Sequence, residues 1–203
     1  MVRAILENRK TQTRRVIKPQ PDRVIGRFPA VDDLGDLEAI RCPYGKPGYR
    51  LWVRETWAPA DKILFGSDLD ECEAVAYKAD GSILDPNGQH FNAFGIDFSK
   101  IRWKPSIHMR RDYSRILLEI TDIRVERLQD IFEADAIAEG VEVVGDNIYG
   151  DPIYMDYSGE SLRGAGWCSA YRSFQSIWKS INGPESWESN PWVWVVEFKR
   201  INQ

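Results

Sequence analysis

Residues 7–15 read ENRKTQTRR and place four cations within nine positions, interleaved with two threonines and a glutamine. In the preceding residues 1–7, apolar side chains at positions 2, 5 and 6 fall on one face of a helix. Asn8 suits the end of such a helix, because asparagine tolerates the left-handed backbone conformation. Three β-branched residues follow within residues 11–16 and favour an extended chain. We therefore expect a short helix, a turn at Asn8 and a strand-like segment.

An extended chain would decide which side chains of this stretch share a face. Alternate residues point the same way, so Lys10 and Thr13 lie on opposite faces unless the chain turns between them. A threonine hydroxyl becomes a nucleophile when a nearby base takes its proton, and burial or neighbouring cations can lower the pKa of a lysine to that end. Two interpretations stay open: a solvated basic turn, and a site where a lysine and a threonine meet.

The charge distribution limits what this protein could bind. The net charge is −4, yet residues 1–27 hold eight lysines and arginines and two acidic residues, a net of +6, which leaves −10 for the remaining chain. A local basic patch on an acidic protein suits a small anionic or nucleotide ligand, or one short RNA contact. It does not suit a long groove that follows a phosphate backbone.

Composition narrows the class of protein further. A length of 203 residues fits one large domain, or one small domain with long insertions. No apolar run approaches the roughly 18 residues that a membrane-spanning helix needs, and no signal peptide is recognisable. Cys42, Cys72 and Cys168 form no Cys-x-x-Cys pair, and we expect free thiols, mostly buried, without a zinc site. These features predict a cytoplasmic protein without cofactor, metal or membrane contact, and they leave its oligomeric state open.

Periodicity predicts the remaining elements. Strands are expected over residues 50–57, 74–79, 114–127 and 192–200, and amphipathic helices over 128–141 and 167–181. In the third strand the apolar positions slip in phase between Ile120 and Ile123, which indicates a bulge or bend. In the first helix we expect Ile131, Ala134 and Ala138 to form the buried stripe. Loop-like insertions are predicted at about 19–47, 58–104 and 142–166.

Several of these segments resemble one protein family. The segment RKTQTRR (residues 9–15) resembles the opening signature of the ASCH superfamily, roughly Gly-x-Lys-Thr-x-Thr/Glu-x-Arg, with Asn8 at the glycine position. GYRLWVRE (48–55) and the closing strand WVWVVEFKR (192–200) resemble further family elements. The chain is most similar to the bacteriophage and prophage branch of this RNA-linked family.

The resemblance implies an α+β fold, namely a small mixed PUA-like β-barrel flanked by helices, in a single domain of residues 1–203. Relatives usually carry an apolar strand before the first helix, whereas this sequence starts at the helix. We expect either that this strand is missing from the sequence or that the barrel closes in another way.

The resemblance also implies a function. In the N4-acetylcytidine amidohydrolases of this family a lysine, a threonine and a glutamate are catalytic, and they correspond to Lys10, Thr13 and Glu139. The chain would then be a metal-independent amidohydrolase acting on N4-acylated cytidine-type nucleosides. A carboxylate at position 139 could hold Lys10 or pass a proton to the leaving amine. The expected substrate-binding residues are Thr11, Arg14, Arg15, Trp52, Arg54 and Glu55.

Other interpretations remain. From the residues alone Glu139 is a surface residue, and Arg54 with Glu55 is an ordinary surface ion pair. A non-catalytic PUA-like module could use the same basic segment to hold flipped-out nucleotides of short single-stranded RNA. Cleavage of RNA is a third possibility that the resemblance leaves open.

Overall fold

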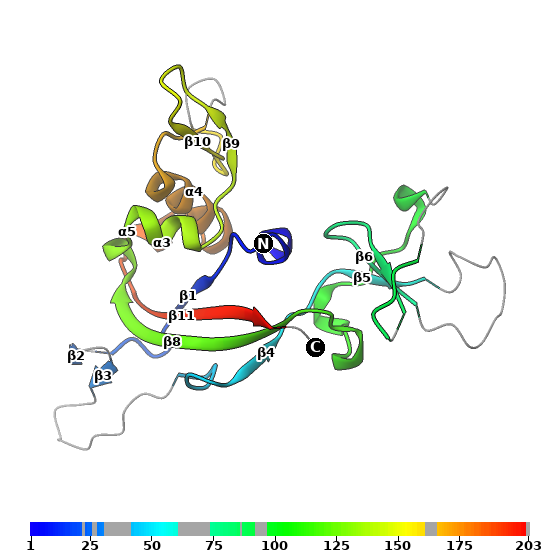
Figure 1. Cartoon of the computed structure of the whole chain (residues 1–203). Coiled ribbons are helices and arrows are strands. Elements are labelled where there is room, and N and C mark those ends of the chain that lie inside the picture. Colours follow the sequence, from blue (N-terminus) through cyan, green and yellow to red (C-terminus); the bar gives the residue numbers. More distant parts are fainter. Residues whose placement is uncertain are drawn as a thin grey trace. The chain divides into compact units, whose positions relative to one another are not determined.

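The computed structural model describes residues 1–21, 23–25, 28–30, 42–60, 74–85, 87–91, 97–160 and 166–201 (Figure 1). The chain divides into two compact units. The larger unit consists mainly of Arg3–Tyr49 and Glu119–Lys199, and the smaller unit mainly of Arg50–Leu118. Each unit has its own apolar core.

The elements of the larger unit are few helices and mostly antiparallel strands. They are α1 (Val2–Leu6), β1 (Gln12–Val16), β2 (Arg23–Ile25), β3 (Phe28–Ala30), β8 (Leu117–Arg127), α3 (Glu133–Ala138), β9 (Val143–Asp146), β10 (Pro152–Tyr154), α4 (Ala170–Asn182), α5 (Glu185–Glu188) and β11 (Trp192–Ile201). The smaller unit holds β4 (Arg50–Trp52), β5 (Trp57–Pro59), β6 (Val75–Tyr77) and β7 (Ile83–Leu84). Single 3₁₀ turns lie at Phe98–Lys100, Ser106–His108, Arg111–Tyr113 and Leu128–Asp130.

A curled antiparallel sheet organises the larger unit, with β11 between β1 and β8. Its two long strands, β8 and β11, curve strongly in Figure 1, as in half of a small barrel. β1 pairs with β11 in a register that runs from Gln12 opposite Glu197 to Val16 opposite Val193. The predicted α+β class is therefore confirmed, and the curled sheet fits a small barrel-like fold.

The apolar core of the larger unit explains why α4 packs beside the sheet. Phe174 and Trp178 lie one helical turn apart on α4 and are buried against Val193 and Val195 of β11. The N-terminus of α4 is capped from α3, because the Glu133 carboxylate accepts hydrogen bonds from the backbone N–H groups of residues 170 and 171 at 2.7 and 3.2 Å. This cap ties α3 to α4.

Several sequence predictions are confirmed in the larger unit. The short first helix ends as expected, and Asn8 adopts a φ of 56°. In β8 the buried positions change phase as predicted, with Ile120 and Ile123 both buried around an exposed Thr121. The second helix and the closing strand also form.

Of the buried stripe predicted for the helix after β8, only Ile131 is confirmed as buried, and it lies before the start of α3. Ala134 is exposed and Ala138 is half-buried, whereas Ala136 is fully buried. The side of α3 that faces the sheet carries Asp135 and Glu139, whose charges are compensated by arginines and a lysine. A pattern of apolar residues could not reveal a face that is buried through ion pairs.

The predicted loop over residues 142–166 contains the antiparallel β9–β10 hairpin, and residues 161–165 lie outside the described residues. Of the cysteines, Cys42 is half-buried and Cys168 is exposed, so the expectation of mostly buried thiols is wrong for Cys168. Cys168 sits between Trp167, which bridges to β10, and the helix cap Ser169, where no core covers it. Cys72 lies outside the described residues.

The smaller unit contains the antiparallel sheet β5-β6-β7. The predicted strand over residues 50–57 divides into β4 and the start of β5. After β6 the chain turns at Asp80 and Gly81, where Gly81 adopts a φ of 74°. The core contains Trp57, Val75, Tyr77, Leu84 and Met109.

Among the described residues of both units, every helix is too short or too polar to span a membrane.

Candidate functional site

The strand-like segment that contains Lys10 lies beside the end of α3 in the larger unit, so that Lys10 contacts Glu139. The two residues form an isolated antiparallel β-bridge. The Lys10 Nζ donates one hydrogen bond to the Glu139 carbonyl oxygen and one to its Oε2, both at 2.8 Å. The two side chains are only 4% and 6% exposed. A lysine and a glutamate far apart in sequence are thus joined in a buried ion pair.

Local backbone contacts hold Lys10 in this position. Its N–H donates to the carbonyl oxygen of Ala4 in α1 at 2.9 Å, and the N–H of Thr11 donates to Ala138 in α3 at 2.8 Å. Gly140 follows Glu139 with a φ of +85°, and a Cβ at this glycine would lie 2.7 Å from the Lys10 Cβ. The close approach of the helix end to Lys10 therefore requires glycine.

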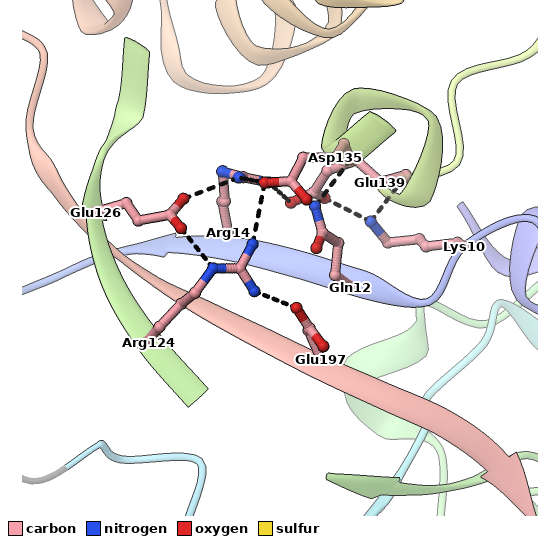
Figure 2. A network of polar contacts seen from close by, with 8 residues as sticks. All are labelled: Lys10, Gln12, Arg14, Arg124, Glu126, Asp135, Glu139 and Glu197. Atoms are coloured by element: carbon pink, nitrogen blue, oxygen red, sulfur yellow. Dashed lines mark hydrogen bonds and ion pairs between the residues drawn. The ribbon is translucent and has the colours of Figure 1, made fainter. Parts of the chain in front are cut away.

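Arg14 connects the same glutamate to two further carboxylates. Its side chain is fully buried. Nη1 donates to Glu139 Oε1 at 3.2 Å, while Nη2 donates to Asp135 Oδ2 at 2.7 Å and to Glu126 Oε2 at 3.1 Å. Asp135 and Glu139 lie four residues apart and so share one face of the helix end. Figure 2 shows Lys10 and Arg14 reaching that face together.

Arg124 of β8 extends the network. Its guanidinium donates to Asp135 Oδ2 at 3.0 Å and also contacts the carboxylates of Glu126 and Glu197. The buried side-chain amide of Gln12 donates a hydrogen bond to the Asp135 carbonyl oxygen at 2.8 Å. The complete network, drawn in Figure 2, comprises Lys10, Gln12, Arg14, Arg124, Glu126, Asp135, Glu139 and Glu197.

Burial gives Lys10 an unusual proton affinity. The largest effect on the pKa of Lys10 is removal from water, which lowers it. Glu139 raises the pKa, whereas the nearby charges of Arg15 and Arg14 lower it. Together these effects bring the pKa of Lys10 below its ordinary value of 10.5. A buried lysine with a lowered pKa that contacts a carboxylate can exchange a proton with it. The network also leaves one polar atom, Arg14 Nε, buried without a hydrogen-bond partner.

The structure brings together two of the three predicted catalytic residues. Glu139 is buried against Lys10, so its interpretation as a surface residue is wrong. Thr13 lies on the other face of β1, where burial alternates along the strand, and no hydrogen bond joins it to Lys10 or Glu139. The chain stays extended between positions 12 and 16 and does not make the turn that would bring Thr13 and Lys10 together.

The predicted substrate-binding residues fall into three environments. Thr11 and Arg15 are exposed. Arg14 is fully buried among carboxylates, where its guanidinium organises the network. Trp52 is half-buried and belongs to the smaller unit, and the Arg54 guanidinium lies 4.7 Å from the centre of its ring.

Glu55, also in the smaller unit, is fully buried and pairs with Arg115. The Arg115 Nε and Nη2 donate to the two Glu55 oxygens at 2.9 and 2.8 Å. The interpretation of Arg54 and Glu55 as a surface ion pair is therefore wrong, because the partner of Glu55 lies sixty positions further along the chain.

Sequence reasoning missed most of the network that surrounds Lys10 and Glu139. The spacing of Asp135 and Glu139 and the polar phase of Arg124 and Glu126 in β8 were available signals, since residues four apart on a helix and two apart on a strand share a face. In the described residues no group of three or more histidine, cysteine or acidic side chains is arranged to hold a metal ion.

Comparisons of the chain with protein-family models, with curated proteins and with solved structures gave no match.

Proposed function

We propose that this chain is a PUA-like protein of the ASCH type that hydrolyses the amide bond of N4-acylated cytidine-type nucleosides. The observation that carries the proposal is the buried pair of Lys10 and Glu139, whose Nζ and Oε2 lie 2.8 Å apart. Its support is chemical: a lysine whose pKa is lowered by burial can act as a base, and an adjacent carboxylate can pass the proton on.

The proposed reaction is an acyl transfer. The Thr13 hydroxyl oxygen attacks the amide carbon while Lys10 takes the hydroxyl proton, and the carbon–nitrogen bond then breaks as the leaving amine receives a proton through Glu139. Water hydrolyses the resulting ester and restores Thr13. Lys10 precedes β1, and Thr13 of β1 points to the opposite side of the chain from Lys10. This scheme therefore requires residues 11–13 to turn when substrate binds.

The test is turnover of N4-acetylcytidine to cytidine, followed by ultraviolet absorbance and mass spectrometry. We expect activity in the wild type, loss of activity in Lys10→Met, Thr13→Ala and Glu139→Gln, and unchanged activity in Thr121→Ala, which removes an exposed threonine of β8. Circular dichroism establishes that each variant is folded. A folded wild type without turnover, or a fully active Lys10→Met variant, would refute the assignment.

A second candidate is a non-catalytic PUA-like module that binds short single-stranded RNA. The position of Thr13 favours it, because an extended β1 separates the proposed nucleophile from its base. In this case the exposed Arg15 and Thr11 contact the RNA, and Arg15→Ala weakens binding. RNA binding without turnover supports this candidate, and a nuclease assay with and without EDTA separates it from RNA cleavage.

A further inference from the structure

A second basic region lies in the smaller unit, far along the chain from the N-terminal one. Residues 98–111 contain five lysines and arginines and no acidic residue. Arg54 adds a further cation from the segment after β4. We call the exposed cations Arg54, Lys104 and Arg111, together with the half-buried aromatic side chains Trp52 and Tyr113, the basic–aromatic surface.

Two of these cations share one tryptophan. The guanidinium carbons of Arg54 and Arg111 lie 4.7 and 5.9 Å from the centre of the Trp52 ring. Arg54 is also anchored, because its Nη1 donates to the carbonyl oxygen of Ile107 at 3.3 Å. The segment that contains residue 107 is thereby held beside Trp52, and planar cations are presented next to an indole ring.

Lys104 belongs to the same surface through a backbone bridge. Its N–H donates to the Trp57 carbonyl oxygen at 2.7 Å, and the Trp57 N–H donates back at 3.2 Å. The Lys104 Nζ lies 4.8 Å from the Trp57 ring centre, and the Trp57 and Tyr113 rings lie 4.9 Å apart. Trp57 is buried, so it supports the surface from below, while Tyr113 is half-buried at its edge.

The charge of this surface is not neutralised locally. In the described part of the smaller unit, no carboxylate lies within ion-pair distance of Arg54, Lys104 or Arg111. Arg115 of the same unit shows the opposite arrangement, since its guanidinium is held by two carboxylates. Exposed cations that keep their charge available next to aromatic rings are suited to an anionic ligand with flat groups.

We propose that the basic–aromatic surface binds single-stranded nucleic acid. Phosphates would pair with the cations, and bases would stack on Trp52 and on the guanidinium planes of Arg54 and Arg111. An acidic peptide would satisfy the charges but would not use the stacking planes. The inference is independent of the amidohydrolase proposal, because it rests on other residues in the other unit.

The test measures binding of the full-length protein to fluorescein-labelled single-stranded RNA and DNA of about 12 nucleotides. The probes are followed by fluorescence anisotropy, starting from about 50 mM salt. The test variant is Lys104→Ala with Arg111→Ala. The control variant is Arg172→Ala with Lys199→Ala in the larger unit, which also removes two cations, one of which lies over a tryptophan, Trp167.

We expect the test variant to bind about tenfold more weakly and to lower the slope of log affinity against log salt by about 1.4, while the control binds like the wild type. Trp52→Leu should weaken binding by about tenfold, and Trp52→Phe should retain most of the affinity because it keeps a stacking ring. Arg15→Ala should have no effect, which separates this surface from the RNA-binding candidate above.

Each of the following results would overturn the inference. They are the absence of binding by the wild type at low salt, equal weakening in the test and control variants, and equally tight binding of polyglutamate, which would identify a general anion surface. Duplex RNA that binds as tightly as the single strand would also count against it, because bases inside a duplex cannot stack on Trp52. Failure of the amidohydrolase test leaves these outcomes unchanged.

Discussion

Each unit of this chain contains an arginine that is held by several side-chain partners, but the two arginines differ in how completely their N–H donors are satisfied. In the smaller unit, Arg115 uses all five of its N–H donors on Glu55, Asp80 and Ser82, and its guanidinium carbon lies 4.1 Å from the centre of the Tyr77 ring. In the larger unit, Arg14 leaves its Nε without a partner.

The larger network also includes a titratable lysine, whereas no lysine takes part in the ion pairs of Arg115. Burial lowers the pKa of Lys10, while the carboxylates around Arg115 raise the pKa of that guanidinium above its usual value despite burial. A satisfied cluster with a strongly held charge stabilises a fold. A cluster that holds a lysine with a lowered pKa is suited to proton transfer. For this reason we place the proposed reaction in the larger unit.

The largest effect is expected from Arg115→Met. It leaves Glu55, which is fully buried, without a cation, and we expect the free energy of unfolding to fall by about 3–5 kcal/mol in urea denaturation. Lys10→Met should cost less, about 1–3 kcal/mol, because Glu139 keeps its contact with Arg14 at 3.2 Å.

The matched control for this comparison is the double variant Glu55→Met with Arg115→Met, which removes both charges and should recover much of the lost stability. Equal losses in Arg115→Met and Lys10→Met would remove the distinction between a structural and a chemical cluster.

The next comparison concerns the glycine beside Lys10, and the informative quantity is its difference from a matched glycine. Gly140 and Gly150 both adopt a φ of +85°, but a Cβ at Gly140 would lie 2.7 Å from the Lys10 Cβ, whereas nothing lies within 4 Å at Gly150. Gly150→Ala should cost about 1–2 kcal/mol for its backbone conformation alone. Gly140→Ala should cost about 1–3 kcal/mol more, because Lys10 must shift. Thermal unfolding of the pair measures the difference, and identical melting temperatures would show that Lys10 is not held in place by this contact.

The cap between α3 and α4 should contribute less. Glu133→Gln keeps the side-chain size but removes the negative charge from the group that accepts hydrogen bonds from the N–H groups of residues 170 and 171. We expect the free energy of unfolding to fall by about 0.5–1 kcal/mol. Because α3 carries Asp135 and Glu139, hydrogen exchange of α3 should accelerate in this variant. Unchanged exchange would show that the larger network holds α3 without help from α4.

The two clusters should also respond to pH in opposite directions. The pKa of Lys10 is lowered, so the unfolded chain binds more protons just below pH 10.5, and Lys10 makes stability rise with pH up to about 10.5. Burial raises the pKa of Tyr77 to about 12, so its contribution is complete below pH 10 and is lost between pH 10 and about 12.

Urea denaturation across pH 8–12 for the wild type, Lys10→Met and Tyr77→Phe separates these contributions, with slopes of at most about 1.4 kcal/mol per pH unit for each group. Lys10→Met should remove the rise, and Tyr77→Phe should reduce the fall. A Lys10→Met profile parallel to that of the wild type would contradict the lowered pKa.

Local patterns in the sequence predicted much of the secondary structure. The helix before Asn8, the phase slip in β8 and the apolar closing strand all follow from periodicity and the backbone preferences of single residues. The division of residues 50–57 between two strands and the β9–β10 hairpin were not predictable in this way, because their pairing partners decide them.

The candidate site was predictable only in part. Alternation in an extended chain correctly separated Lys10 from Thr13, and a resemblance, not the residues themselves, pointed to Glu139. Arg115 pairs with Glu55 and Arg124 with Glu197 across 60 and 73 positions of the chain, and charge patterns carry no information about such distant pairing. Buried charged residues are therefore where sequence reasoning failed most often in this protein.

The most direct test of the central claim is the titration of Lys10 itself. The protein is labelled with ¹³C at the lysine side chains, and the Cε–Hε signals are followed by NMR from pH 7 to 12, with Lys10→Met used to assign the signal of Lys10. If burial outweighs the pull of Glu139, Lys10 titrates below the ordinary value of 10.5. A midpoint at or above 10.5 would mean that Lys10 is a permanently charged structural cation, and the proton-transfer role of the larger network would be contradicted.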